Sequence, residues 1–175
     1  MIPLTHIATG YLLSESYCAM TKVVCANNPT LTLLAVTGSV LPDIDLLSSK
    51  KLNKHHDTLW HSPIFWALIT LLFILGRYYV SFDMKYIIAF SFGIFSHLFL
   101  DWFGGRTTGI RLLYPYSNKM YSAFKLNPKL GYINILPNKK NYTEHIQYVK
   151  YYFTNRFLII IEISLIVVAL LLLFL

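Results

Sequence analysis

The sequence predicts an all-α, polytopic helical membrane protein with about five membrane helices and a partly ordered cytoplasmic segment. Two observations support this fold class. Hydrophobic residues make up 55% of the 175 residues and charged residues only 13%, and the mean hydropathy is +0.52, which is unlike an ordinary soluble domain. The apolar residues also collect in runs that approach the roughly 20 residues a spanning helix needs.

The first two predicted helices are the least apolar. Thr5–Ala26 is amphipathic, and Thr30–Leu41 has only about a dozen residues before Pro42, which we expect to stop the helix. Asn27–Pro29 between them is a helix-stop and turn signal. The pattern therefore predicts a hairpin of two short or tilted helices.

The three later helices are more apolar. Pro63–Val80 begins after Ser62, a plausible helix cap, and places a proline in the first turn. Tyr86–Phe103 is interrupted only by one histidine and one aspartate, and Phe157–Leu175 holds a single charge, Glu162. All three runs are long enough to be membrane helices.

The chain divides into three parts on this basis: a helical membrane bundle (1–117), a basic cytoplasmic segment (118–156) and a C-terminal membrane helix (157–175). The polar region from Gly104 to Arg156 is long for a structureless loop, so we expect partial order against the membrane face. Its positive charge is attributed to the bias of basic residues toward the cytoplasm. Binding of anionic lipid head groups is the functional alternative, and no nucleic-acid partner is expected.

The basic residues also orient the chain, because they favour cytoplasmic loops. Twelve of the fifteen fall on one side of the five-helix arrangement, which predicts a multi-pass protein of a bacterial-type cytoplasmic (inner) membrane with its N-terminus in the cytoplasm. The twelve are Lys50, Lys51, Lys54, Arg106, Arg111, Lys119, Lys125, Lys129, Lys139, Lys140, Lys150 and Arg156, and the other three are Lys22, Arg77 and Lys85.

The two cysteines do not suggest a secreted or disulfide-rich protein. Cys18 and Cys25 are seven residues apart in a helix-like apolar stretch, and we interpret them as small buried hydrophobic side chains. The N-terminus also lacks the basic start and small-residue cleavage site of a signal peptide.

Acids and histidines gather in four short segments, although the chain has only eight acidic residues and six histidines. The predicted topology puts all four segments at one membrane face. The candidate metal ligands are His6, Asp43, Asp45, His56, His61, His97 and Asp101.

The spacing of the acids suits metal binding. His97 and Asp101 are four residues apart and share one helix face, and ionisable groups in a membrane segment usually face a cavity or a partner. Asp43 and Asp45 follow Pro42, where we expect extended chain. Their side chains would then point to opposite sides, so that one binds metal while the other orients a histidine or bridges a second ion.

The other histidines complete the set. His56 and His61 are five residues apart, which implies a loop or a helix start between them, and Asp57 is placed to hold the tautomer of His56. Imidazole and carboxylate ligands suit zinc, manganese or iron. Because the set exceeds what one tetrahedral ion needs, we expect one or two divalent ions, with zinc favoured.

The order of these motifs resembles the YdjM-like family of predicted membrane-bound metal-dependent hydrolases. The likeness covers residues 1–117, and the matching pieces are His6, Leu41–Asp45, His56–Ser62, Ser96–Asp101 and Thr108–Pro115. It implies a helical membrane bundle, a divalent-metal hydrolase and a distant similarity to zinc-dependent phospholipase C and nuclease folds. The ligands it implies are His6, Asp43, His56, His61, His97 and Asp101, with Asp45 as a ligand or a neighbour of one.

This chain departs from the family pattern within the third motif. The family usually has Arg-Gly after the first histidine and Thr before the second, whereas this chain has Asp57, Thr58 and Trp60.

The leading functional hypothesis is a hydrolase at the cytoplasmic membrane face that cuts a phosphoester of a membrane lipid with metal-activated water. Arg106 and Arg111 are expected to pair with the substrate phosphate, and Asp45 or Asp57 to accept the proton from water. Two alternatives are a cation or proton transporter that uses buried His and Asp, and a noncatalytic membrane scaffold with a structural metal. The sequence indicates no protein partner.

Overall fold

The computed structural model describes residues 1–47, 49, 56–127, 129, 134 and 142–174. These residues form an all-α structure, as predicted. They contain no strand, although Ile110 and Tyr121 form an isolated antiparallel bridge. The α-helices are α1 (Pro3–Thr21), α2 (Pro29–Val40), α3 (Pro63–Gly76), α4 (Met84–Gly104), α5 (Tyr142–Tyr152) and α6 (Arg156–Leu173). Short 3₁₀ helices are η1 (Cys25–Asn27), η2 (Leu41–Leu47) and η4 (Leu59–His61).

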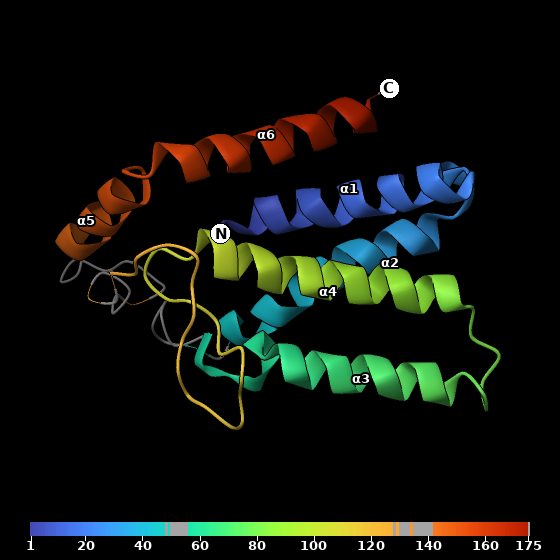
Figure 1. Cartoon of the computed structure of the whole chain (residues 1–175). Helices are drawn as coiled ribbons and strands as arrows, with labels where there is room; N and C mark the ends of the chain where they lie inside the picture. The colour runs from blue at the N-terminus through green and yellow to red at the C-terminus, as the bar shows by residue number, and fades with distance from the viewer. Residues whose placement is uncertain (48, 50–55, 128, 130–133, 135–141, 175) are drawn as a thin grey trace.

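The centre of the bundle is the group formed by α1, α2 and α4, which contact one another. In Figure 1, α6 lies along the α1 side of this group and α3 lies on the opposite side against α4. Much of the surface of α3 and α6 is apolar and exposed, with Leu72 and Ile160 both 62% exposed. Exposed apolar faces of this kind suit helices that contact lipid.

Small residues let the central helices approach closely. A Cβ added to Gly38 of α2 would overlap the backbone carbonyl of Phe90, and one added to Gly93 of α4 would overlap the carbonyl of Ala35. Such close backbone packing at small residues is the usual way in which membrane helices associate. It fixes α2 against α4 on the approach to the polar end of the bundle.

The N-terminal hairpin is present, but its helix ends differ from the prediction. α1 stops at Thr21 rather than Ala26, because Lys22 adopts a left-handed conformation (φ 56°) that caps the helix. α2 ends at Val40, just before Pro42, as predicted, but the segment that follows is not the extended chain expected for Asp43 and Asp45. Leu41–Leu47 forms the 3₁₀ helix η2 instead, and Pro42 stands second in it, where its missing N–H costs little.

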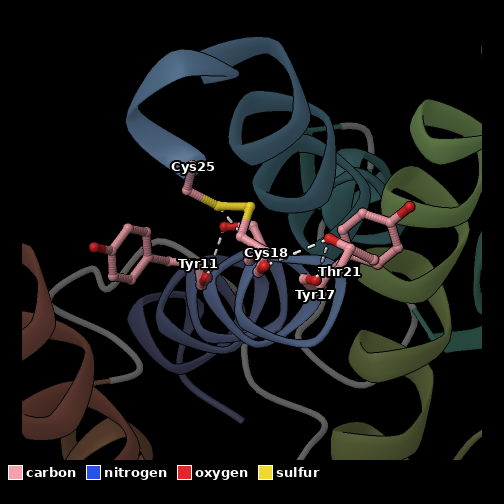
Figure 2. The surroundings of a disulfide bond; sticks show 6 residues. Tyr11, Tyr17, Cys18, Thr21 and Cys25 are labelled. Carbon is pink, nitrogen blue, oxygen red and sulfur yellow. Dashed lines mark hydrogen bonds between the residues drawn. A yellow bond between two sulfur atoms is a disulfide. The ribbon is translucent and has the colours of Figure 1, made fainter. Parts of the chain in front are cut away.

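The interpretation of the cysteines was wrong, since Cys18 and Cys25 form a disulfide (Figure 2). In one continuous helix their Cα atoms would be about 10 Å apart, too far to bridge. The end of α1 at Thr21 reverses the chain and brings the two Cα atoms to 5.6 Å. The bond ties the last turn of α1 to η1, and both cysteines are buried.

Three segments of the described chain are long and apolar enough to cross a membrane: Pro29–Leu47, Met84–Gly104 and Arg156–Leu173. α3 is apolar but shorter, so the count of five crossings stays a prediction. Within the basic segment the structure describes α5, a helix with no buried residue. Part of the orientation depends on residues that lie outside the described part of the chain, namely Lys50, Lys51, Lys54, Lys139 and Lys140.

Candidate metal centre

The polar side chains singled out in the sequence meet at one end of the bundle, which we call the metal end. Here the first turns of α1, the 3₁₀ helices η2 and η4 and the last turns of α4 come together, near the label N in Figure 1. The side chains involved are His6 of α1, Asp43 and Asp45 of η2, His56, His61 of η4, and His97 and Asp101 of α4. All of them except Asp43 are less than 9% exposed.

Four of these residues, Asp43, His61, His97 and Asp101, surround one point, with ligand atoms that all lie within 4.8 Å of one another. The Nε2 atoms of His61 and His97 are 3.4 Å apart, and Oδ1 of Asp43 is 3.6 Å from each of them. Oδ2 of Asp101 is 3.5 Å from Nε2 of His61 and 3.0 Å from Nε2 of His97. A tetrahedral zinc site with bonds of 2.0–2.2 Å has edges of about 3.3–3.6 Å. Four of the five distances lie in this range and the fifth, 3.0 Å, is shorter, so the four residues could hold such an ion.

The histidine tautomers also suit metal binding. Nδ1 of His97 lies 2.8 Å from the backbone carbonyl of Ser39, and a carbonyl can only accept, so Nδ1 carries the proton. Nδ1 of His61 lies 3.2 Å from Oδ2 of Asp45, which holds it in the same tautomer. Each ring therefore turns its Nε2 lone pair toward the other, an arrangement that a shared cation stabilises.

The charge balance at His61 favours a cation as well. Burial disfavours a charged imidazole there, but hydrogen bonds with Asp101, Asp43 and Asp45 outweigh it and hold the pKa of His61 well above its ordinary value. Positive charge therefore stabilises these carboxylates, and either a proton or a divalent ion can supply it. The proton and the ion compete for Nε2 of His61.

His6 and His56 lie outside this group of four but next to it. The ring of His6 stacks on that of His97 with centroids 3.9 Å apart, and the ring of His56 stacks on that of His61 at 4.4 Å. Nε2 of His6 is 3.4 Å from Oδ1 of Asp101, and Nε2 of His56 is 3.7 Å from Oδ2 of the same carboxylate. Asp101 therefore lies at the centre of all four histidines, and its Oδ1 also accepts from the α-amino group of Met1 at 2.9 Å.

Comparison with known protein families identifies the family of the chain. The model of the YdjM inner membrane protein family matches residues 1–175, the whole chain. The chain belongs to the YdjM family. The match extends beyond residues 1–117, where the motifs lie, and its description agrees with the apolar helices in marking an inner membrane protein. No curated protein and no solved structure matches the chain significantly.

The departures from the YdjM pattern acquire structural roles. Thr58 donates a hydrogen bond to Oδ2 of Asp45, the carboxylate that holds His61, and the ring of Trp60 packs against those of Phe65 and Trp66, with centroids 6.2 and 5.6 Å away. Sequence reasoning missed the contribution of Thr58, as it missed the carbonyl of Ser39. Neither leaves a recognisable signal in a single sequence.

Asp57 and Arg111 meet outside the metal end's interior. The carboxylate of Asp57 is 39% exposed, and its Oδ1 lies 3.1 Å from Nη2 of Arg111. Nη1 of Arg111 donates to the backbone carbonyl of Asp57 at 3.1 Å. The structure thus places these two predicted site residues together, but as a surface pair.

Arg106, by contrast, is 7% exposed and lies beside the metal end. Its Nη1 is 3.0 Å from Oε1 of Glu162 on α6, and its guanidinium stacks over the ring of Tyr152 at 3.8 Å. Tyr152 donates its phenolic hydrogen to the same Glu162, and burial together with this bond raises the pKa of Tyr152. Sequence reasoning noted Glu162 only as a lone charge, because its partner is 56 residues away.

Proposed function

We propose that this protein is a membrane-bound, metal-dependent hydrolase that acts at the cytoplasmic face on a phosphoester of a membrane lipid. The observation that supports it most directly is that Asp43, His61, His97 and Asp101 bring four ligand atoms around one point at separations close to those of a tetrahedral divalent ion. Zinc is the ion we favour, with manganese or iron as alternatives. The apolar helices around the centre suit a substrate whose tails stay in the bilayer.

In this proposal, different residues of the chain hold the ion, orient its ligands and accept the proton from water. Asp43, His61, His97 and Asp101 would hold the ion, which when bound lowers the pKa of water and polarises a phosphoryl oxygen. Asp45 would orient His61 through Nδ1 and is the buried candidate for accepting the proton from water. The other predicted acceptor, Asp57, is engaged with Arg111 at the surface, which makes it the weaker candidate.

A second ion is part of the proposal. His6 and His56 lie on two sides of Asp101, and the carboxylate has one oxygen near each of them. Replacing His6 and His56 with alanine should lower the metal content from two ions to one if both sites fill, and leave it unchanged if only the first does.

A structural metal is the second candidate, because one observation favours it. Structural zinc sites use four protein ligands, whereas catalytic sites keep a position for water, and the first group has four. Cobalt-substituted protein distinguishes the two. A spectrum that changes on adding phosphate indicates an open position and supports the hydrolase, and an unresponsive spectrum supports the scaffold.

The orientation rests on two independent features at opposite ends of the bundle. The basic residues favour a cytoplasmic metal end, and the Cys18–Cys25 disulfide lies at the other end, where an oxidising compartment would preserve it. In a chain without the native cysteine pair, a cysteine introduced at Met20, which is 84% exposed beside the disulfide, should react with a membrane-impermeant maleimide in intact cells. A cysteine introduced at exposed Asn118, in a chain without the native pair, should react only after the membrane is opened.

The first experiment is elemental analysis of the detergent-purified protein, followed by a screen of lipid phosphoesters with the metal-loaded form. We expect stoichiometric zinc, manganese or iron and release of phosphate or of a phosphorylated head group. Absence of bound metal after reconstitution would refute the proposal and favour transport through the buried His and Asp side chains.

A further inference from the structure

A small cavity adjoins the metal end on the side of α5 and α6. It has a volume of about 50 Å³ and is partly open to the surface. Its lining is mostly polar and includes His56, the segment from Gly104 to Thr108, Tyr148 and Tyr152. Because Nε2 of His56 also lies 3.7 Å from Asp101, the cavity and the metal ligands are direct neighbours.

The most unusual group in this cavity is the guanidinium of Arg106. Its side chain is 6% exposed, yet its Nε and Nη2 atoms have no hydrogen-bond partner among the described residues. Leaving a buried donor without a partner is costly, and more so for a charged group. Nε and Nη2 form one edge of the guanidinium, the pair of parallel donors that binds two oxygens of a phosphate or carboxylate.

The other edge of Arg106 is already held. Nη1 pairs with Oε1 of Glu162 at 3.0 Å, and the ring of Tyr152 covers one face at 3.8 Å. The backbone carbonyl of Arg106 accepts from the N–H of Asn127 at 2.9 Å and from the hydroxyl of Tyr151 at 3.3 Å. With Nη1 and one face engaged and its backbone anchored, Arg106 keeps the Nε–Nη2 edge of its guanidinium for a ligand.

We infer that Arg106 forms an oxyanion subsite beside the metal centre, that it receives the phosphate group of the substrate there, and that Glu162 of α6 is its positioning residue. The inference rests on the proposed function for the identity of the anion. It assigns the phosphate to Arg106 rather than Arg111, whose guanidinium is engaged with Asp57. It also makes the C-terminal helix part of the site instead of only a membrane anchor.

The test measures binding of inorganic phosphate to the full-length, detergent-solubilised protein, with and without metal. We expect Arg106→Lys to weaken binding about tenfold or more, because lysine keeps the charge opposite Glu162 but cannot donate two parallel hydrogen bonds. Arg156→Lys, at the exposed start of α6, is the matched control and should bind as wild type does. Unchanged affinity in a folded Arg106→Lys protein would overturn the subsite.

The Glu162→Gln variant tests whether Glu162 positions the guanidinium of Arg106 or acts only through its negative charge. Removing a negative charge near the cavity should strengthen anion binding if only Coulomb attraction matters. If Glu162 positions the guanidinium, the same change should weaken phosphate binding several-fold. Tighter binding would refute the positioning role. The double variant Arg106→Gln/Glu162→Gln removes both buried charges and should lose the phosphate site in a protein that still folds.

A second binding experiment, with a lipid ligand, shows whether the phosphate comes from a lipid or from a soluble compound. Together with an activity assay, it also separates the subsite proposal from the hydrolase proposal. Short-chain phosphatidic acid that binds more tightly than inorganic phosphate, with the same dependence on Arg106, indicates a lipid substrate; equal affinities indicate a soluble one. Phosphate binding that requires Arg106 without any hydrolysis supports the subsite and refutes the hydrolase. Hydrolysis with an unchanged KM in Arg106→Lys would refute the subsite and leave the hydrolase standing.

Discussion

At the metal end, helices from three parts of the chain meet through buried histidines and carboxylates, whereas at the hairpin end α1 and η1 are joined by the disulfide between Cys18 and Cys25. The covalent bond needs no ligand. The metal end, in contrast, gathers buried carboxylates beside histidines, the α-amino group of Met1 and the hydroxyl of Thr58, and we expect added positive charge to stabilise it. The difference predicts that changes at the hairpin end affect stability, whereas changes at the metal end affect metal binding and the proposed activity.

The largest expected effect comes from removing ligands at the metal end. Replacing His97 and Asp101 together with alanine should abolish metal binding, measured by elemental analysis. Asp101→Asn should lower turnover about a thousandfold, since the several kcal/mol of transition-state stabilisation that a metal provides would be lost. Circular dichroism should show that the helices persist. Metal retained at full stoichiometry in the double variant would contradict the assignment of the centre.

A smaller effect is expected from Asp45, which touches His61 rather than the central point. Asp45→Asn should lower metal affinity about 10- to 100-fold, as is typical for a residue that orients a ligand. Competition with a chromophoric chelator measures the change. Asp83→Asn is the control, because this exposed carboxylate pairs with Lys85 at the start of α4, away from the metal end. Equal affinities in the two variants would show that Asp45 does not act through His61.

Helix packing supports the metal end, because Gly93 lets α4 lie against the backbone of α2 at Ala35 and Ser39, and the carbonyl of Ser39 orients His97. Gly93→Ala should force the helices apart at a cost of about 1–3 kcal/mol and weaken metal binding about tenfold. Gly76→Ala is the matched control, because a Cβ there meets nothing within 4 Å. A thermal shift in detergent and chelator competition give the two readouts, and unaltered metal affinity in Gly93→Ala would uncouple packing from the centre.

The contrast between the ends also explains what the sequence could predict. The pairing of His97 with Asp101 follows from helical periodicity. The predicted order of the helices also places the four polar segments at one end of the bundle, where the structure brings them together. Whether these residues bind metal stays a prediction. The disulfide depends on a single residue in the left-handed conformation, Lys22, which ends α1 early. No pattern in the sequence predicts that conformation.

Long-range pairs were likewise beyond local patterns. Glu162 meets Arg106 only because α6 returns beside α1, where its carboxylate is 3.0 Å from the guanidinium. Thr58 supports Asp45 across 13 residues of irregular chain. Such contacts are set by packing between elements, which hydropathy and spacing do not encode.

The smallest effect on activity is expected at the hairpin end. Replacing both Cys18 and Cys25 with serine should leave metal content and turnover unchanged, because the disulfide and the metal ligands lie at opposite ends of the bundle. Closure of so short a loop stabilises by about 2 kcal/mol in the chain-entropy account, so the melting temperature in detergent should fall by several degrees. Reducing agent should reproduce that fall in the wild-type protein and cause no further change in the variant. Loss of metal on reduction would instead show that the two ends are coupled through α1, and that the hairpin helps to hold His6 in place.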